Sequence, residues 1–179
     1  MTELAAFCYY LYMVEIKEAD LIDGTLKSRR DTRDAAGILL LHLEVEPDFV
    51  RTAPHTSDGV TEWIQRKRFE AFWFAEVDDR RVGMIGLSSH LYQEMDESQP
   101  EDVEICRLIV TPEMRGKGIG KKLFQVALAS CEGRSPWLTV LVGSDADKMY
   151  RDWGWVELGR VPIQDDPMDR IVALKPPGA

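Results

Sequence analysis

The segment from Val103 to Ala129 constrains the fold of this chain most strongly. An apolar run rich in β-formers, VEICRLIV, is followed by TPEMRGKG, and an amphipathic run then begins with IGKKLF. The proline and the three closely spaced glycines favour a sharp turn between the two runs. The pattern therefore predicts a buried strand, a tight turn and a helix whose first turn carries few bulky side chains.

This turn has the properties of an anion site. Its three glycines leave the first N–H groups of the helix pointing outward, and the helix dipole adds partial positive charge there. Four cationic side chains surround it, at Arg115, Lys117, Lys121 and Lys122. The turn therefore predicts a pyrophosphate site. The alternative is a plain tight turn in which the glycines only permit close packing.

Two common nucleotide-binding motifs do not fit this segment. The Walker pattern fails because Gly116 and Gly120 are wrongly spaced and no Ser or Thr follows a lysine. The dinucleotide fingerprint fails because Leu123 stands where its third glycine belongs. A protein that binds ATP or NAD through this turn is therefore the weaker alternative.

Composition limits the class of protein. The 179 residues suit one domain, 1–179, and 45% apolar with 30% charged residues is typical of a soluble globular protein. A net charge of −9 argues against a general nucleic-acid binder. No apolar run is long enough to span a membrane, and the three cysteines have no metal-ligand spacing. We expect no metal and a cytoplasmic location.

The remaining pattern alternates strands and helices. A strand is expected at 5–16, a mostly helical stretch at 20–43, a loop at 44–59, a helix at 60–70 capped by Ser57 or Asp58, a hairpin at 71–92, a strand at 136–143, a short helix at 145–154 and two final strands at 155–163 and 169–176. A central strand–helix–strand unit within a mostly antiparallel set indicates a mixed α/β sheet.

The run RLIVTPEMRGKGIGKKLF resembles the acyl-CoA-binding motif of the GNAT superfamily of N-acetyltransferases. The family pattern Arg/Gln-x-x-Gly-x-Gly/Ala is met by Arg115, Gly118 and Gly120. A second family signature, Tyr-x-x-x-Gly-Phe/Trp, is matched by Tyr150 to Trp155. Order and spacing agree from about residue 71 to residue 161.

The resemblance implies an α/β (α+β) fold. Its sheet would be mixed, mostly antiparallel and six- to seven-stranded, flanked by about four helices. The cofactor strand and the strand from Pro136 would run parallel and splay into a V. The cofactor would be acetyl-CoA, whose pantetheine arm pairs in the family with the strand and whose pyrophosphate binds the loop. Carried over, the strand residues are Leu108, Ile109 and Val110, and the loop residues are Arg115, Gly116, Lys117, Gly118, Ile119, Gly120 and Lys121.

The resemblance also implies two catalytic residues. Tyr150 matches the tyrosine that donates a proton to the leaving thiolate; the alternative is an aromatic anchor. Glu104 is a base candidate, but a register slip at a bulge would turn it to solvent. The backbone N–H of Ile109 or Val110 is the expected oxyanion donor.

Other polar residues are given structural roles. His42 is expected at the edge of an apolar helix, and Cys106 inside a strand. The basic run 66–68 is expected on a solvated helix face, or beside a cofactor phosphate.

The expected function is transfer of an acetyl group from acetyl-CoA to a primary amine of a small molecule, by direct attack in a ternary complex. A non-catalytic acyl-CoA-binding or sensor module, and acetylation of a protein N-terminus or lysine, are the alternatives. Segments 43–62 and 162–169, expected to choose the acceptor, contain acidic residues that favour a cationic amine. We expect no nucleic-acid or membrane partner, and a monomer or homodimer.

Overall fold

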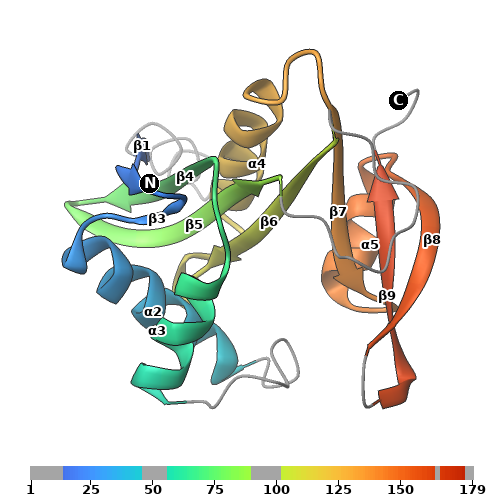
Figure 1. Cartoon of the computed structure of the whole chain (residues 1–179), viewed down its shortest axis with the longest axis horizontal. Helices are drawn as coiled ribbons and strands as arrows, with labels where there is room; N and C mark the ends of the chain where they lie inside the picture. Colours follow the sequence, from blue (N-terminus) through green and yellow to red (C-terminus); the bar gives the residue numbers. More distant parts are fainter. Residues whose placement is uncertain (1–13, 46–55, 90–101, 164–165, 176–179) are drawn as a thin grey trace, which may run out of the picture.

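A single mixed sheet crosses the molecule. The computed structural model describes residues 14–45, 56–89, 102–163 and 166–175, with backbone only from residue 161 onward. The strands of the sheet are β1 (Glu15–Glu18), β4 (Ala71–Val77), β5 (Arg80–Ser88), β6 (Asp102–Val110), β7 (Ser135–Leu141), β8 (Val156–Ile163) and β9 (Asp166–Lys175). They lie in the order β1-β4-β5-β6-β7-β9-β8 (Figure 1).

All neighbouring strands are antiparallel except β6 and β7, which are parallel. The mixed, mostly antiparallel sheet expected from the sequence is thereby confirmed, with seven strands.

Helices cover both faces of the sheet. In the described residues they are α2 (Arg29–Leu43), α3 (Ser57–Arg66), α4 (Ile119–Ala129) and α5 (Asp145–Asp152), with a 3-10 turn η2 (Pro112–Met114). The helices α2 and α3 pack on one face, whereas α4 lies on the other (Figure 1). None of the described helices has the length and apolarity needed to cross a bilayer.

The sequence of β4 is largely apolar, without alternation of apolar and polar residues, and the packing of its side chains explains this pattern. Phe72 and Phe74 pack into the cluster formed with α2 and α3, whereas Trp73, Ala75 and Val77 pack into the cluster formed with α4. Because successive side chains point to opposite faces, a strand covered on both sides has to be apolar throughout.

The parallel strands β6 and β7 separate after a short contact. They pair only where Asp102, Val103 and Glu104 face residues 135–137. Beyond this point β6 pairs with β5 alone and β7 with β9, and the two strands diverge in Figure 1. The predicted V-shaped opening is confirmed, and it exposes one edge of β6.

A bulge lies in β6 next to this opening. Met84 of β5 faces Ile109 and Gly86 faces Cys106, so two residues of β6 lie between these pairs where β5 has one. Arg107, the first of them, has a φ of 61°. Such a backbone conformation is unfavourable for a residue with a side chain, and it is typical of functional regions.

The helical stretch expected from residue 20 is wrong in its first part. Residues 21–26 form a separate hairpin of β2 (Leu21–Ile22) and β3 (Thr25–Leu26). Asp23 and Gly24 both have positive φ, which a helix does not allow. Leu21 and Leu26 are cross-strand partners, so their shared apolar side belongs to a hairpin.

Two boundaries also differ from expectation. Thr56 caps α3, because its Oγ1 accepts a hydrogen bond from Gly59 N at 3.2 Å, and Ser57 is already helical. Three consecutive residues have good capping chemistry, so only the backbone decides between them. Strand β9 begins at Asp166, inside the expected turn. The expected first strand and the loop after α2 lie largely outside the described residues, although β1 includes residues 15 and 16.

Candidate active site

The connection between β6 and α4 contains two glycines in the left-handed region. Gly116 has a φ of 72° and Gly118, the N-cap of α4, has a φ of 79°. A Cβ added at Gly116 would have no atom within 4 Å, so the space beside it is open. The turn therefore needs glycine for its conformation, and it leaves its backbone accessible to a ligand.

The N-terminus of α4 is suited to an anion. Gly118 offers no side-chain cap, and the first turn of the helix contains no acidic residue. Lys121 is exposed in this turn, and Lys117 lies at its entrance, where its Nζ donates to Glu113 O at 3.1 Å. Uncapped N–H groups with cations around them form a site for phosphate oxygens.

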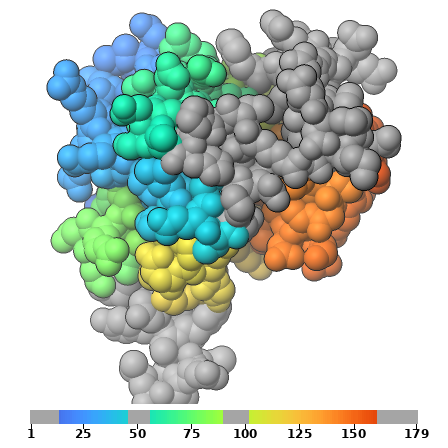
Figure 2. All heavy atoms as spheres, turned by 90° about the horizontal axis from the view of Figure 1, so that it is seen from below, coloured from blue at the N-terminus to red at the C-terminus, as the bar shows by residue number. Residues whose placement is uncertain are grey.

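Arg115 joins this loop to helix α2. Its Nε donates to Val110 O at 3.2 Å, and its Nη2 lies 2.6 Å from His42 Nδ1. The C-terminal part of α2, in cyan, borders the segment after β6, in yellow, in Figure 2. His42 is therefore a buried neighbour of the loop. Sequence reasoning missed this contact, because the two residues are 73 positions apart.

Glu104 lies at the apex of the V and is buried. It is 3% exposed, its carboxylate forms an ion pair with Lys67, and Thr139 Oγ1 of β7 donates to Oε1 at 3.5 Å. The bulge follows Glu104 in the chain, so it does not turn this side chain to solvent. The expectation that Lys67 lies on a solvated helix face is wrong, since its side chain is only 17% exposed.

Cys106 lies among the charged groups of this apex. Burial raises the pKa of its thiol to about 12, the negative charge of Glu104 raises it further, and the positive charges of Arg107 and Lys67 lower it. These three charged groups therefore lie within electrostatic range of one thiol. The thiol stays protonated at neutral pH, so it is not an activated nucleophile.

Tyr150 of α5 reaches the same region from the opposite side of the sheet. It is 7% exposed, and its ring lies 5.5 Å from that of Phe124 and 5.6 Å from that of Trp153. Burial raises the pKa of its phenol well above the ordinary value, and Cys106 adds to this effect. The phenol therefore remains protonated at neutral pH.

Arg107 and Trp63 form a contact that the sequence pattern did not indicate. The guanidinium carbon lies 3.2 Å from the centroid of the indole ring, and Nη2 donates to Trp63 O at 3.4 Å. The stack fixes a cation beside the bulge of β6. It depends on the bulge and on α3 together, so no single sequence segment contains it.

The structure brings the expected residues to one opening. Leu108, Ile109 and Val110 lie on the part of β6 that has no β7 partner in the described residues, between Glu104 and the glycine loop. An extended chain with amide groups could pair with this edge, as the pantetheine arm requires. Within the described ranges, no three His, Cys, Asp or Glu side chains gather as metal ligands.

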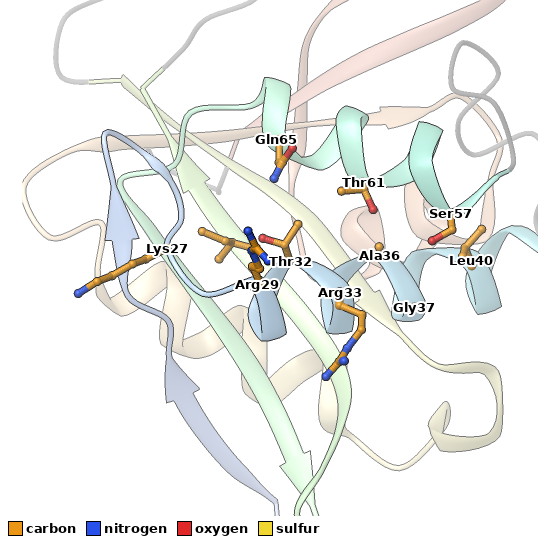
Figure 3. A pocket seen from close by; sticks show the side chains of 11 residues that line it. Lys27, Arg29, Thr32, Arg33, Ala36, Gly37, Leu40, Ser57, Thr61 and Gln65 are labelled. Atoms are coloured by element: carbon orange, nitrogen blue, oxygen red, sulfur yellow. The ribbon is translucent and has the colours of Figure 1, made fainter.

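A separate groove lies between α2 and α3. It encloses about 420 Å³ and is lined by residues that include Thr32, Gly37, Thr61 and Gln65 (Figure 3). Trp63, which contacts the apex, lies between the last two in sequence and therefore points to the opposite side of α3. The groove is thus distinct from the opening between β6 and β7.

Comparisons with known proteins agree with this geometry. The model of the acetyltransferase (GNAT) family matches residues 38–155. An uncharacterized N-acetyltransferase of Archaeoglobus fulgidus is 28% identical over 81 residues, which are 45% of this chain and 54% of that protein. The match thus spans about half the length of that relative.

Solved acetyltransferases share the fold. A histone acetyltransferase HPA2-related protein of Corynebacterium glutamicum superposes with a TM-score of 0.68 at 18% identity, covering 93% of this chain and 98% of that one. The protein yncA of Salmonella typhimurium, solved with its cofactor acetyl-CoA, gives 0.64 at 14% identity, covering 91% and 92%. An aminoglycoside 6'-N-acetyltransferase complexed with coenzyme A gives 0.63 at 16% identity, covering 90% and 95%.

At these identities the solved structures show the fold alone, whereas the family model covers more than half of the sequence, including the glycine loop and Tyr150. The chain belongs to the acetyltransferase (GNAT) family.

Proposed function

We propose that this protein transfers the acetyl group of acetyl-CoA to the primary amine of a small molecule, by direct attack in a ternary complex. The observation that carries this proposal is the open edge of β6, which runs from an uncapped helix N-terminus to a buried carboxylate. One continuous surface thus offers a phosphate site, a strand edge and an acid–base pair.

The cofactor would lie along this surface. The N–H groups at the start of α4, with Arg115, Lys117 and Lys121, would hold the pyrophosphate. The backbone of Leu108 to Val110 would pair with the pantetheine arm as a neighbouring strand does. Acetyl-CoA supplies the thioester, whose C–S bond breaks as the new C–N bond forms.

Two side chains would manage the protons. Glu104 would accept the proton of the acceptor ammonium, directly or through a water molecule, and Tyr150 would give its proton to the departing sulfur. Backbone N–H groups at the bulge and just after it, including Ile109 and Val110, are candidates for stabilising the charge that develops on the carbonyl oxygen.

Direct attack is supported by the state of the nearby cysteine. An acetylated cysteine would require a thiolate, and the pKa of Cys106 is about 12. This argues against an acetylated Cys106 and supports attack of the amine on the thioester while both are bound.

Two alternatives predict different outcomes. A sensor module would bind acetyl-CoA but release no thiol with any amine. An enzyme for protein termini or lysines would acetylate peptides and leave small amines unchanged. The buried Glu104 and the protonated Tyr150 favour catalysis over a sensor, because two groups with opposite proton roles both lie within electrostatic range of Cys106.

Binding and turnover test the proposal in order. Calorimetry with acetyl-CoA, and with ATP and NAD as controls, should give micromolar affinity for acetyl-CoA alone. Release of free thiol is then measured with amines and with peptides that contain lysine or a free N-terminus. Absence of acetyl-CoA binding would overturn the cofactor assignment, and binding without thiol release would support the sensor alternative.

A further inference from the structure

The wall of the opening that faces α3 is rich in hydrogen-bond donors. Lys67, at the C-terminal end of α3, extends its ammonium group to Glu104, and the guanidinium of Arg107 is fixed on the Trp63 ring. Both cations lie within electrostatic range of Cys106. The apex therefore presents two positive charges beside one buried carboxylate.

A third donor lies next to Glu104. Trp137 of β7 is the register partner of Glu104, and it is 4% exposed. Its indole Nε1 has no hydrogen-bond partner among the residues that the structure describes. Because an indole N–H can only donate and its burial without a partner is costly, this group is suited to an acceptor oxygen of a ligand.

The pairing of Lys67 with Glu104 has the charge pattern of a zwitterion. An ammonium and a carboxylate held side by side can exchange partners with a molecule that carries the same two groups. The amine of that molecule would then bind Glu104, and its carboxylate would bind the Lys67 ammonium. Two ion pairs would replace one, so neither buried charge would lose its partner.

We infer that the acceptor is an α-amino acid or a close analogue, whose carboxylate is bound by Lys67, Arg107 and the Trp137 N–H while its amine faces Glu104. This inference rests on the proposed acetyltransferase function and specifies its substrate class. Lys67, Arg107 and Trp137 are binding residues here, and Glu104 keeps its role as base.

The backbone of Arg107 is consistent with this role. A positive φ at a residue with a side chain is unfavourable, and such strain persists only where the surrounding structure holds the residue in place. In this strand the strain turns a guanidinium toward α3 and the apex, where it stacks on Trp63. A guanidinium held in this way matches the two oxygens of a carboxylate.

The acidic loop residues favour a cationic amine as the acceptor, whereas the groups at the apex favour an amine that also carries a carboxylate. Of the acidic residues in segment 43–62, Glu44, Asp58 and Glu62 lie in the described ranges, and all three are exposed. They can steer a cation at long range, whereas groups that touch the acceptor at the apex decide which one is held. A polycationic amine would place further positive charge beside Lys67 and Arg107, which is unfavourable.

Matched acceptors test the inference directly. With saturating acetyl-CoA, thiol release is measured for L-phenylalanine, phenylalanine amide and phenethylamine, and for L-leucine, leucine amide and isoamylamine. The amides and amines lack the carboxylate but retain the nucleophile. We expect kcat/KM to be at least about tenfold higher for the amino acid than for its amide or amine in at least one series, because a charged hydrogen bond is lost without the carboxylate.

Three variants distinguish binding of the acceptor carboxylate from positioning of Glu104. Lys67→Met removes the charge at similar length, and it should bring the ratio of kcat/KM for amino acid over amine close to one, whereas Lys67→Arg should keep the preference. Trp137→Phe removes the N–H and retains a large ring. It should raise the KM for the amino acid several-fold and leave the KM for the amine unchanged.

Each result has a defined meaning. Equal turnover of amino acids and simple amines, or activity confined to polyamines or peptides, would overturn the inference and leave the acetyltransferase function standing. An unchanged ratio in Lys67→Met would limit Lys67 to positioning Glu104 and would also overturn it. Failure of the wild-type protein to bind acetyl-CoA would instead overturn the proposed function.

Discussion

At the scale of single residues, burial separates the roles of the ionisable groups at the apex. Tyr150 and Cys106 both have a raised pKa, and the largest cause for each is loss of water on burial. A buried phenol remains a proton donor, and a buried thiol remains unreactive. Glu104 is also buried, but it keeps a cationic partner in Lys67.

Tyr150→Phe tests the proton donor. The ring contacts with Phe124 and Trp153 are retained, so the affinity for acetyl-CoA should not change. Turnover should fall by about 100-fold, because the departing sulfur loses its acid. The measurements are kcat by thiol release and Kd by calorimetry. Unchanged kcat would make Tyr150 an aromatic anchor.

Cys106→Ala tests direct attack. Burial raises the pKa of the Cys106 thiol to about 12, so the thiol is protonated at pH 7 and the residue should contribute little to turnover. We expect kcat within about threefold of wild type, and no acetyl adduct on the wild-type protein by intact mass spectrometry after mixing with acetyl-CoA. An adduct that forms and decays at the rate of turnover would contradict the ternary-complex mechanism.

At the scale of elements, the site depends on where β6 stops pairing. The strand pairs with β7 at three positions and then presents a free edge, a bulge and the glycine loop in succession. Helix α4 contributes mainly its first turn, since Ile119, Leu123 and Phe124 pack into the core. A short stretch of chain therefore contains most of the cofactor site.

Two substitutions of similar shape at Gly116, to asparagine and to aspartate, test whether the glycine loop binds the pyrophosphate. Asparagine tolerates positive φ better than most residues, so Gly116→Asn should weaken acetyl-CoA binding only modestly. Gly116→Asp has nearly the same shape but adds a negative charge where the pyrophosphate should lie. We expect its Kd to be at least about tenfold higher than that of the Asn variant at low salt.

This difference between the two variants should shrink at high ionic strength, because salt screens the charge. Circular dichroism should show that both variants keep the fold. Equal affinity of the two variants for acetyl-CoA would show that the loop does not bind the pyrophosphate.

At the scale of the whole molecule, Arg81 connects elements on the α2 side of the sheet. Its guanidinium pairs with Asp31 of α2 at 2.6 Å and with Glu76 of β4 at 3.4 Å, and it lies 4.0 Å from the centroid of the Phe74 ring. Lys17 of β1 pairs with the same Glu76. The edge of the sheet and the first long helix are thus held by one network.

Glu76→Gln tests this network through pH. Lys17 and, less strongly, Arg81 lower the pKa of Glu76 below 4.5, so its stabilising effect is present above pH 4.5 and lost as the pH falls through the lowered pKa. At pH 7 the variant should lose about 1–3 kcal/mol of unfolding free energy, because the largely buried guanidinium of Arg81 loses a charged partner.

Urea unfolding of both proteins between pH 7 and pH 3 measures this effect. The difference in unfolding free energy should shrink below pH 4.5. Glu62→Gln is the control, since its exposed pair with Arg66 should contribute less than about 1 kcal/mol. A difference that stays constant down to pH 3 would contradict the assigned pKa shift.

The local patterns that were interpreted correctly share a physical basis. Strand β4 occupies residues 71–77 as expected, and α4 begins directly after Gly118. A strand covered on both faces and a helix that follows a glycine turn each leave a strong local pattern. The hairpin at residues 21–26 was missed because Leu21 and Leu26 meet across a turn, whereas the four-residue spacing of Ile22 and Leu26 also fits a helix.

The sequence by itself determined the mixed sheet, the position of the glycine loop and the family, because these depend on periodicity and on residues that are adjacent in the chain. Only the tertiary structure decided that His42 contacts Arg115, that Lys67 is buried against Glu104 and that Arg107 stacks on Trp63. Each of these pairs joins α2 or α3 to β6 or its loop. Their partners are fixed by how helices pack on the sheet and by a bulge in one strand, and neither leaves a local pattern in the sequence.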